Sequence, residues 1–93
     1  MALEECLHAK AFGRVQGVGF RFFVKENARK IGLKGWVKNC SDGSVELEAF
    51  GDRKSLELLL KILQEDSGFA SVERIEQEFS SKKCGFEEFS IKF

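Results

Sequence analysis

A glycine-rich segment at residues 13–21, GRVQGVGFR, separates two stretches of different hydrophobic period. Over residues 6–12 apolar side chains recur at every second position, which is typical of a β-strand. After the segment, five apolar residues recur at the spacing of one helix face: Phe20, Phe23, Val24, Ala28 and Ile31. Gly32 follows them at a position where helices commonly end. The chain must therefore turn from strand to helix within a few residues that include three glycines.

This connection predicts a binding site for an anion such as phosphate. Gly13, Gly17 and Gly19 tolerate backbone angles that bring successive amide groups onto one concave side. The first amides of a helix have no intrahelical partner, and the helix dipole favours negative charge there by roughly 0.3 to 1 kcal/mol. Arg21 falls in the expected first turn, where an acidic residue is usual. An external anion between its guanidinium and the amides accounts for an arginine at this place.

The rest of the chain predicts a strand–helix–strand–strand–helix–strand order with a short final strand. Residues 33–40 and 44–50 read as a hairpin around the turn residues Ser41, Asp42 and Gly43. Asp52 is placed to cap a second helix, whose leucines recur at helical spacing: Leu56, Leu59, Leu60 and Leu63. A fourth strand within residues 71–79 carries a pattern break that indicates a bulge, and a fifth strand places three residues on one face: Phe89, Ile91 and Phe93.

These elements predict an α+β domain spanning residues 1–93. Neither helix can bury its apolar stripe alone, so both are expected on one face of an antiparallel sheet. The order is that of a ferredoxin-like α/β sandwich. The chain is 43% hydrophobic and contains ten phenylalanines, which we assign to the core together with the leucine stripe.

Composition limits the classes of function. No apolar run approaches the roughly 20 residues that cross a bilayer, and the N-terminus does not resemble a secretion signal, so we expect a soluble cytoplasmic protein. Three cysteines (Cys6, Cys40 and Cys84) and one histidine, His8, lack metal-ligand spacing. We therefore expect free thiols, no metal and no cofactor. His8 is expected to be a surface or half-buried residue within a strand, away in sequence from the glycine segment.

A net charge of zero conceals an uneven distribution of charge along the chain. Residues 10–38 contain eight basic residues and one acidic residue, whereas residues 39–93 contain seven basic and twelve acidic residues. The first stretch places positive potential near the glycine segment. The acidic remainder would repel a long phosphate backbone, so a small anionic ligand fits better than nucleic acid.

Two segments together resemble the acylphosphatase family, GRVQGVGFR at residues 13–21 and GWVKNCSDGSVE at residues 35–46. The resemblance implies hydrolysis of carboxyl-phosphate anhydrides by a monomeric enzyme that needs neither a metal ion nor a covalent phosphoenzyme, with inorganic phosphate as product and competitive inhibitor. It implies that Arg21 binds the phosphoryl group and that Asn39 positions the attacking water. It also implies that the main chain of the loop contributes phosphate contacts from Val15, Gln16, Gly17, Val18, Gly19 and Phe20.

Other interpretations stay open at this point. The glycines alone are compatible with a tight connection, Arg21 with a surface arginine, and Asn39 with a turn cap. A binding module of the same fold is the main alternative, either an RNA-binding domain that stacks bases on Trp36 or a regulatory phosphate-binding domain. We expect neither nucleic acid nor a membrane as a partner.

Overall fold

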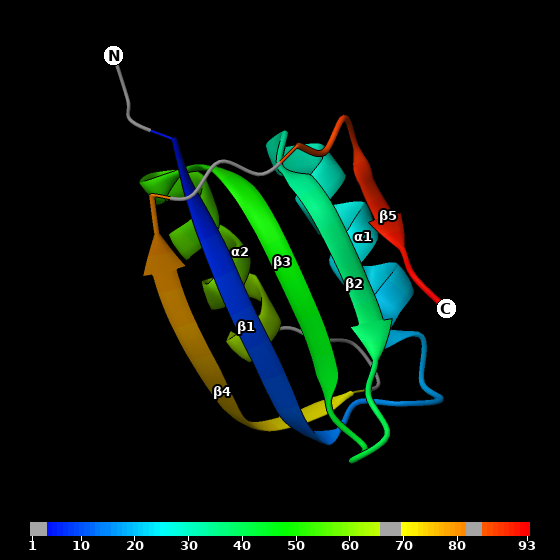
Figure 1. Cartoon of the computed structure of the whole chain (residues 1–93). Coiled ribbons are helices and arrows are strands. Elements are labelled where there is room, and N and C mark those ends of the chain that lie inside the picture. Colours follow the sequence, from blue (N-terminus) through cyan, green and yellow to red (C-terminus); the bar gives the residue numbers. More distant parts are fainter. Residues whose placement is uncertain (1–3, 66–69, 82–84) are drawn as a thin grey trace.

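The structure, a computed structural model, describes residues 4–65, 70–81 and 85–93 (Figure 1). The elements follow in the order β1 (Glu4–Arg14), α1 (Phe20–Ile31), β2 (Lys34–Asn39), β3 (Val45–Asp52), α2 (Arg53–Glu65), β4 (Ser71–Ser80) and β5 (Phe89–Ile91). This is the predicted βαββαβ order with a short final strand. No helix in the described part of the chain is long and apolar enough to span a membrane.

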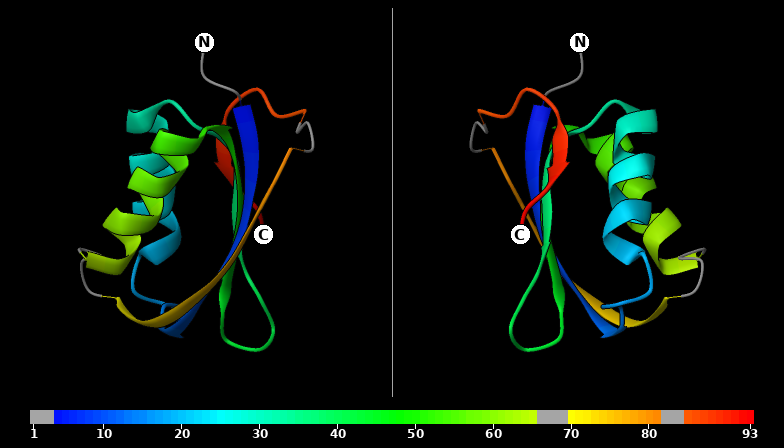
Figure 2. Two further views of the ribbon diagram at one scale, coloured as in Figure 1. Left: turned by 90° about the vertical axis from the view of Figure 1, so that its left-hand side faces the viewer. Right: turned by 90° about the vertical axis from the view of Figure 1, so that its right-hand side faces the viewer.

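The five strands form one sheet in the order β4-β1-β3-β2-β5. The first four pair antiparallel, whereas β5 pairs parallel to β2, so the sheet is mixed at one edge. Both helices cover the same face, and the other face stays open (Figure 2). The ferredoxin-like sandwich is confirmed, with β5 as a parallel addition to the antiparallel sheet.

The core lies between the sheet and the helices because each central strand alternates. In β1 the helix-facing side chains are Leu7, Ala9 and Ala11, all almost fully buried. In β2 the same face carries Gly35 and Val37, so Asn39, two residues further on, continues this row at the end of the strand. The helices complete the core with their buried stripes: Phe20, Val24, Ala28, Leu56, Leu59, Leu60 and Leu63.

Both predicted helix boundaries have the expected caps. Asp52 accepts a hydrogen bond at Oδ1 from the amide of Ser55 at 2.8 Å, which is N-cap geometry. Gly32 adopts a positive φ of 93°, and the amides of Gly32 and Leu33 both donate to the carbonyl of Ala28. These bonds satisfy carbonyl and amide groups that the ends of a helix leave unpaired.

Two details of the prediction are corrected. Strand β1 runs to Arg14 rather than ending at residue 12, so Gly13 belongs to the strand and not to the loop. Its partner β4 carries the predicted bulge here, because Gly13 pairs with Val72 while Phe12 pairs with Arg74. A Cβ on Gly13 would lie 2.3 Å from the carbonyl oxygen of Ser71, which explains the glycine.

The assignment of all phenylalanines to the core was only partly right. Four belong to the core or pack against it: Phe20, Phe23, Phe79 and Phe89. Three are half-buried outside it, namely Phe12, Phe50 and Phe86, and Phe69 lies outside the described residues. The remaining two are exposed. Phe22 is 57% exposed on α1 and Phe93, beyond the end of β5, is fully exposed. Phe22 lies on the outer side of its helix, where the apolar period does not reach, and Phe93 has left the strand whose alternation would have faced it inward. Both flank Arg21, which gives them a different significance below.

Candidate anion-binding site

Residues 15–19 connect the end of β1 to the first turn of α1 without regular structure. Gly17 and Gly19 have φ angles of 75° and 78°, in the left-handed region that side chains disfavour. Nothing lies within 4 Å of a Cβ built on either glycine, so backbone angle rather than crowding selects glycine here. The two left-handed residues bend the loop around the N-terminus of the helix.

The amide groups of this turn have no protein acceptor. Gly19 is the N-cap of α1, makes no side-chain cap, and accepts the first helical bond from the amide of Phe23. Within the described residues, no backbone or side-chain acceptor receives a hydrogen bond from the amides of residues 16–22. Unpaired amides at a helix N-terminus form a favourable environment for an anion.

Arg21 stands in this first turn, and the turn contains no acidic residue. Its guanidinium lies 5.3 Å from the centre of the Phe93 ring, a cation–π contact. Among the described residues it has no ion pair, although other arginines of the chain do: Arg29, Arg53 and Arg74. The guanidinium donors of Arg21 are therefore available to an external anion.

A pocket of about 170 Å³ opens at this turn. It is lined by residues of the loop and the first turn of α1 and by two residues near the C-terminus: Val15, Gly17, Gly19, Phe20, Arg21, Phe22, Ile91 and Phe93. Of the predicted loop residues, Gln16 and Val18 do not line it. Val18 packs against the core instead, so any role of these two at the pocket falls to their main chain.

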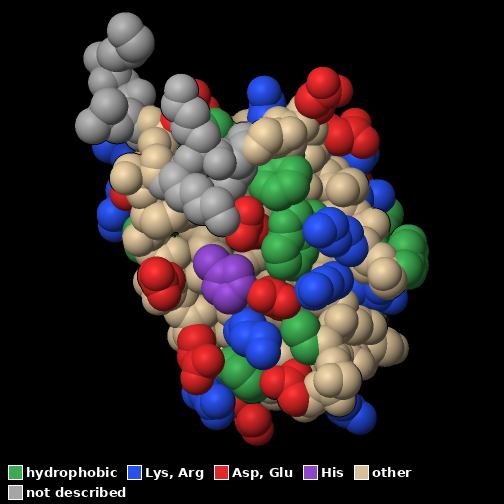
Figure 3. Space-filling model, viewed as in Figure 1, with side chains coloured by type: hydrophobic (Ala, Val, Ile, Leu, Met, Phe, Trp, Pro, Cys, Tyr) green, Lys and Arg blue, Asp and Glu red, His purple; other side chains and the backbone are tan. Residues whose placement is uncertain are grey.

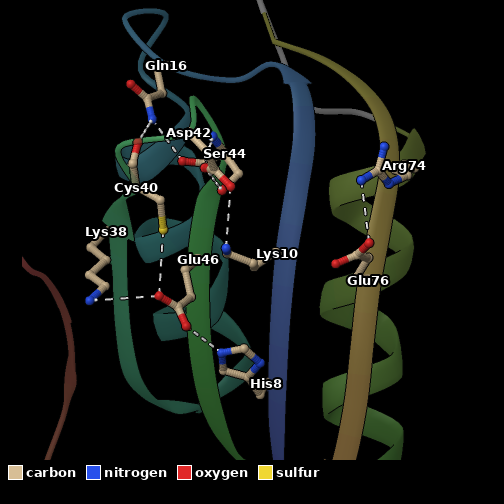
Figure 4. A network of polar contacts seen from close by, with 10 residues as sticks. All are labelled: His8, Lys10, Gln16, Lys38, Cys40, Asp42, Ser44, Glu46, Arg74 and Glu76. Atoms are coloured by element: carbon tan, nitrogen blue, oxygen red, sulfur yellow. Dashed lines mark hydrogen bonds and ion pairs between the residues drawn. The ribbon is translucent and has the colours of Figure 1, made fainter.

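The Gln16 side chain joins the loop to the β2–β3 turn (Figure 4). Its Nε2 donates to the carbonyl oxygens of Cys40 and Ser44, both at 2.8 Å. Only the main chain of Gln16 was expected at the site, and this bridge was not predicted. The signal in the sequence was a carboxamide side chain within a glycine-rich loop, because its nitrogen carries two donors that can bond two carbonyl groups.

The turn that Gln16 contacts is itself closed by local hydrogen bonds. Asp42 accepts from both the amide and the hydroxyl of Ser44, and the amide of Cys40 donates to the Ser44 carbonyl at 2.9 Å. The Ser44 bonds, with a smaller contribution from Lys10, hold the pKa of the Asp42 carboxyl below its ordinary value. The turn is thus a compact unit against which the loop is fixed.

Asn39 is the last residue of β2, directly before this turn. It is exposed, and its carboxamide makes no hydrogen bond to the residues that the structure describes. Figure 1 shows the loop before α1 passing the end of β2, so Arg21 and Asn39 come from the same end of the molecule. Asn39 does not itself line the pocket.

His8 lies on the opposite face of the sheet. As expected it is half-buried within β1, where its Nε2 donates to Glu46 at 2.5 Å. This bond, together with Cys40 and Lys38, lowers the pKa of the Glu46 carboxyl. Neither His8 nor Glu46 lines the pocket, so His8 is not placed to act on a ligand there. Within the described ranges no three histidine, cysteine or acidic side chains are grouped to hold a metal.

The fold and this turn define a small α/β sandwich with a glycine loop at the N-terminus of its first helix. The family model for acylphosphatase matches residues 7–91. The acylphosphatase of Salinibacter ruber is 43% identical over 89 residues, which cover 96% of this chain and 94% of that protein. The chain belongs to the acylphosphatase family.

Solved structures agree with this assignment. The crystal structure of acylphosphatase from Bacillus subtilis matches with a TM-score of 0.92 at 39% identity, over 96% of this chain and 99% of that one. Full-length HypF, in a phosphate- and nucleotide-bound form, matches with a TM-score of 0.87 at 27% identity. That match covers all of this chain but 12% of HypF, so the same fold also occurs as part of a much longer protein.

Proposed function

We propose that this acylphosphatase holds the phosphoryl group of its substrate between Arg21 and the main chain of residues 15–20. The observation that carries the proposal is that, among the described residues, the amides of residues 16–22 have no acceptor and the Arg21 guanidinium at the same turn has no ion pair. The planar guanidinium can bond two phosphoryl oxygens and keeps its charge. The amides of Gly17, Gly19 and their neighbours add preorganised donors where negative charge collects.

Asn39 positions the attacking water in this proposal. A carboxamide both accepts from and donates to water, which fixes its orientation without supplying a strong base. The water oxygen bonds to phosphorus as the bond from phosphorus to the carboxylate oxygen breaks, and a phosphate oxygen takes the water proton. The carboxylate is already a good leaving group, so positioning and charge stabilisation carry most of the catalysis. None of these steps requires a metal ion.

We further propose that residues 1–93 act as a single monomeric domain in the cytoplasm, without nucleic acid or membrane partners. The free thiol of Cys40 fits a reducing compartment; Cys84 lies outside the described residues. The open sheet face mixes acidic and basic side chains (Figure 3). On it the Trp36 ring is approached by the ammonium groups of Lys38 and Lys92, 5.4 and 4.6 Å from its centre. This leaves a poor platform for stacked RNA bases.

The test is whether the purified protein hydrolyses benzoyl phosphate in excess chelator. The release of inorganic phosphate measures the reaction. We expect turnover unaffected by the chelator and competitive inhibition by inorganic phosphate, because product and substrate share the amide and arginine contacts. Turnover that disappears with chelator would contradict the metal-free mechanism. Phosphate binding without turnover would favour the alternative of a phosphate-binding module.

A further inference from the structure

The pocket beside Arg21 has a wall that phosphate binding does not explain. Besides the two glycines and Arg21, the lining includes three large apolar side chains, Phe22, Ile91 and Phe93, which we call the apolar wall. A phosphoryl group carries its charge on oxygen atoms and gains from polar neighbours, not from aromatic ones. Large apolar side chains left open to solvent beside a ligand site typically mark a surface that is covered on binding.

The apolar wall is held in place by two contacts from α1. The Nε of Arg29 donates to the carbonyl oxygen of Phe89 at 2.8 Å, which fixes β5 against the helix that carries Phe22. The guanidinium of Arg21 lies against the ring of Phe93. The anion-binding and apolar sides of the pocket therefore share one residue, and a molecule bound to Arg21 has these rings beside it.

The size of the pocket suits a ring-sized group. An apolar protein cavity of about 150 Å³ is large enough to take up benzene. The present pocket measures about 170 Å³, and its lining includes Gly17 and Gly19 of the loop. The phosphoryl group of an acyl phosphate can occupy the amide side while the group on its carboxyl carbon extends along the apolar wall.

We infer that Phe22, Ile91 and Phe93 form a subsite for the acyl half of the substrate, and that the enzyme prefers acyl phosphates with aromatic or other bulky apolar acyl groups. The inference rests on the proposed function, because it takes the phosphoryl group to be held at Arg21. Such a pocket was not predictable from the sequence, because Phe22 and Phe93 are far apart in the chain and both read as core residues.

The first experiment compares kcat/KM for benzoyl phosphate and acetyl phosphate. We expect the ratio to favour benzoyl phosphate by about tenfold or more, as differences of a few apolar carbons do in other enzyme pockets. In Phe22→Ala and Phe93→Ala the ratio should fall several-fold. Both side chains are exposed, so neither change removes core packing. Leu58→Ala is the matched control, because Leu58 is an exposed apolar residue on α2, and it should keep the wild-type ratio.

Comparing ratios between variants cancels the difference in intrinsic reactivity of the two substrates. Wild-type ratios retained in both phenylalanine variants, with turnover intact, would overturn the subsite and leave the proposed function standing.

Equilibrium binding separates the two hypotheses if no turnover is found. By calorimetry we expect phenylphosphonate to bind about tenfold more tightly than methylphosphonate, and this advantage should be lost in Phe22→Ala and Phe93→Ala. Tighter binding of phenylphosphonate without hydrolysis of either substrate would support the subsite and contradict the catalytic function. Equal affinities for the two phosphonates would overturn the subsite, and failure of both to bind would overturn the subsite and the anion site together.

Discussion

At the level of single residues, Arg21 has no ion pair in the described part of the chain, whereas three other arginines do: Arg29, Arg53 and Arg74. Arg21 stands where a helix begins, beside amides without acceptors among the described residues, and its guanidinium lies against the ring of Phe93. An arginine at this end of a helix is unfavourable for the isolated helix. The unfavourable placement becomes useful once a dianion lies between the guanidinium and the helix.

Arg21→Ala is expected to raise KM and to lower kcat, with a loss of roughly 10²- to 10³-fold in kcat as for other preorganised donors. Asn39→Ala is expected to lower kcat with little change in KM, because Asn39 contacts the water and not the phosphate in this proposal. Steady-state kinetics with benzoyl phosphate measure both. Arg14→Ala, which removes an exposed arginine just before the loop, should change neither constant by more than a few-fold. Equal KM effects at positions 21 and 39 would refute the division of roles.

Gln16 is expected to position the loop rather than to touch the substrate. In Gln16→Ala the carbonyls of Cys40 and Ser44 keep other backbone partners, so the loss of stability should stay near 1 kcal/mol. The loop would lose its bridge to the turn after Asn39, and kcat should fall by about tenfold or more. Gln16→Glu should be worse, since a carboxylate cannot donate to the two carbonyls.

Asn27→Ala is the matched control for Gln16, because Asn27 also donates from a carboxamide to a carbonyl at 2.8 Å, within α1. Thermal melting and kcat are measured together for all three variants. A Gln16→Ala variant with wild-type kcat would show that the bridge has no catalytic consequence.

At the level of elements, the sheet requires glycine where strands approach closely. Gly35 of β2 has a φ of 144°, and a Cβ there would lie 1.8 Å from the carbonyl oxygen of Glu48. Gly35→Ala should therefore destabilise the protein by roughly 2 to 4 kcal/mol, through backbone strain and overpacking. Gly85→Ala is the control, since a Cβ at Gly85 meets nothing within 4 Å. Urea unfolding followed by circular dichroism compares the two, and equal midpoints would contradict the crowding argument.

Most elements were predictable because their signals are local. Alternation, helical period, the Asp52 cap and the Gly32 stop each depend on residues a few positions apart, and the glycine loop followed from the same kind of evidence. The Gln16 bridge, the parallel pairing of β5 and the exposed wall of Phe22 and Phe93 were not predictable. Each depends on which distant segments lie side by side. A hydrophobic pattern indicates which face of a strand or helix is buried, but not which other segment packs against it.

At the level of the whole molecule, the open sheet face carries a chain of polar contacts from His8 to Lys38 through Glu46. The pKa of Glu46 is lowered in the folded protein, first by the His8 hydrogen bond. A lowered carboxyl pKa contributes stability above the unfolded value of about 4.3, and this contribution is lost as the pH falls through the folded value. The contacts thus favour the folded state at neutral pH and less so in acid.

Glu46→Gln should lower the melting temperature at pH 7 by a few degrees, corresponding to about 1 kcal/mol. The difference from wild type should shrink as the pH is lowered from 5 toward 3. Scanning calorimetry across this range measures it. Glu87→Gln, at an exposed position without an ion pair among the described residues, is the control. A difference that persists unchanged into acid would show that Glu46 acts through packing and not through its charge.

The parallel pairing of β5 with β2 has a consequence for the order of folding. The pocket needs Ile91 beside Val15, residues far apart in the sequence, and contacts between distant segments form late because loop closure costs entropy. A chain with both helices docked but β5 still detached would have the glycine loop and Phe22 without Ile91 and Phe93. Ligands that touch these two residues bind the finished molecule more tightly, so they stabilise it against loss of its last strand.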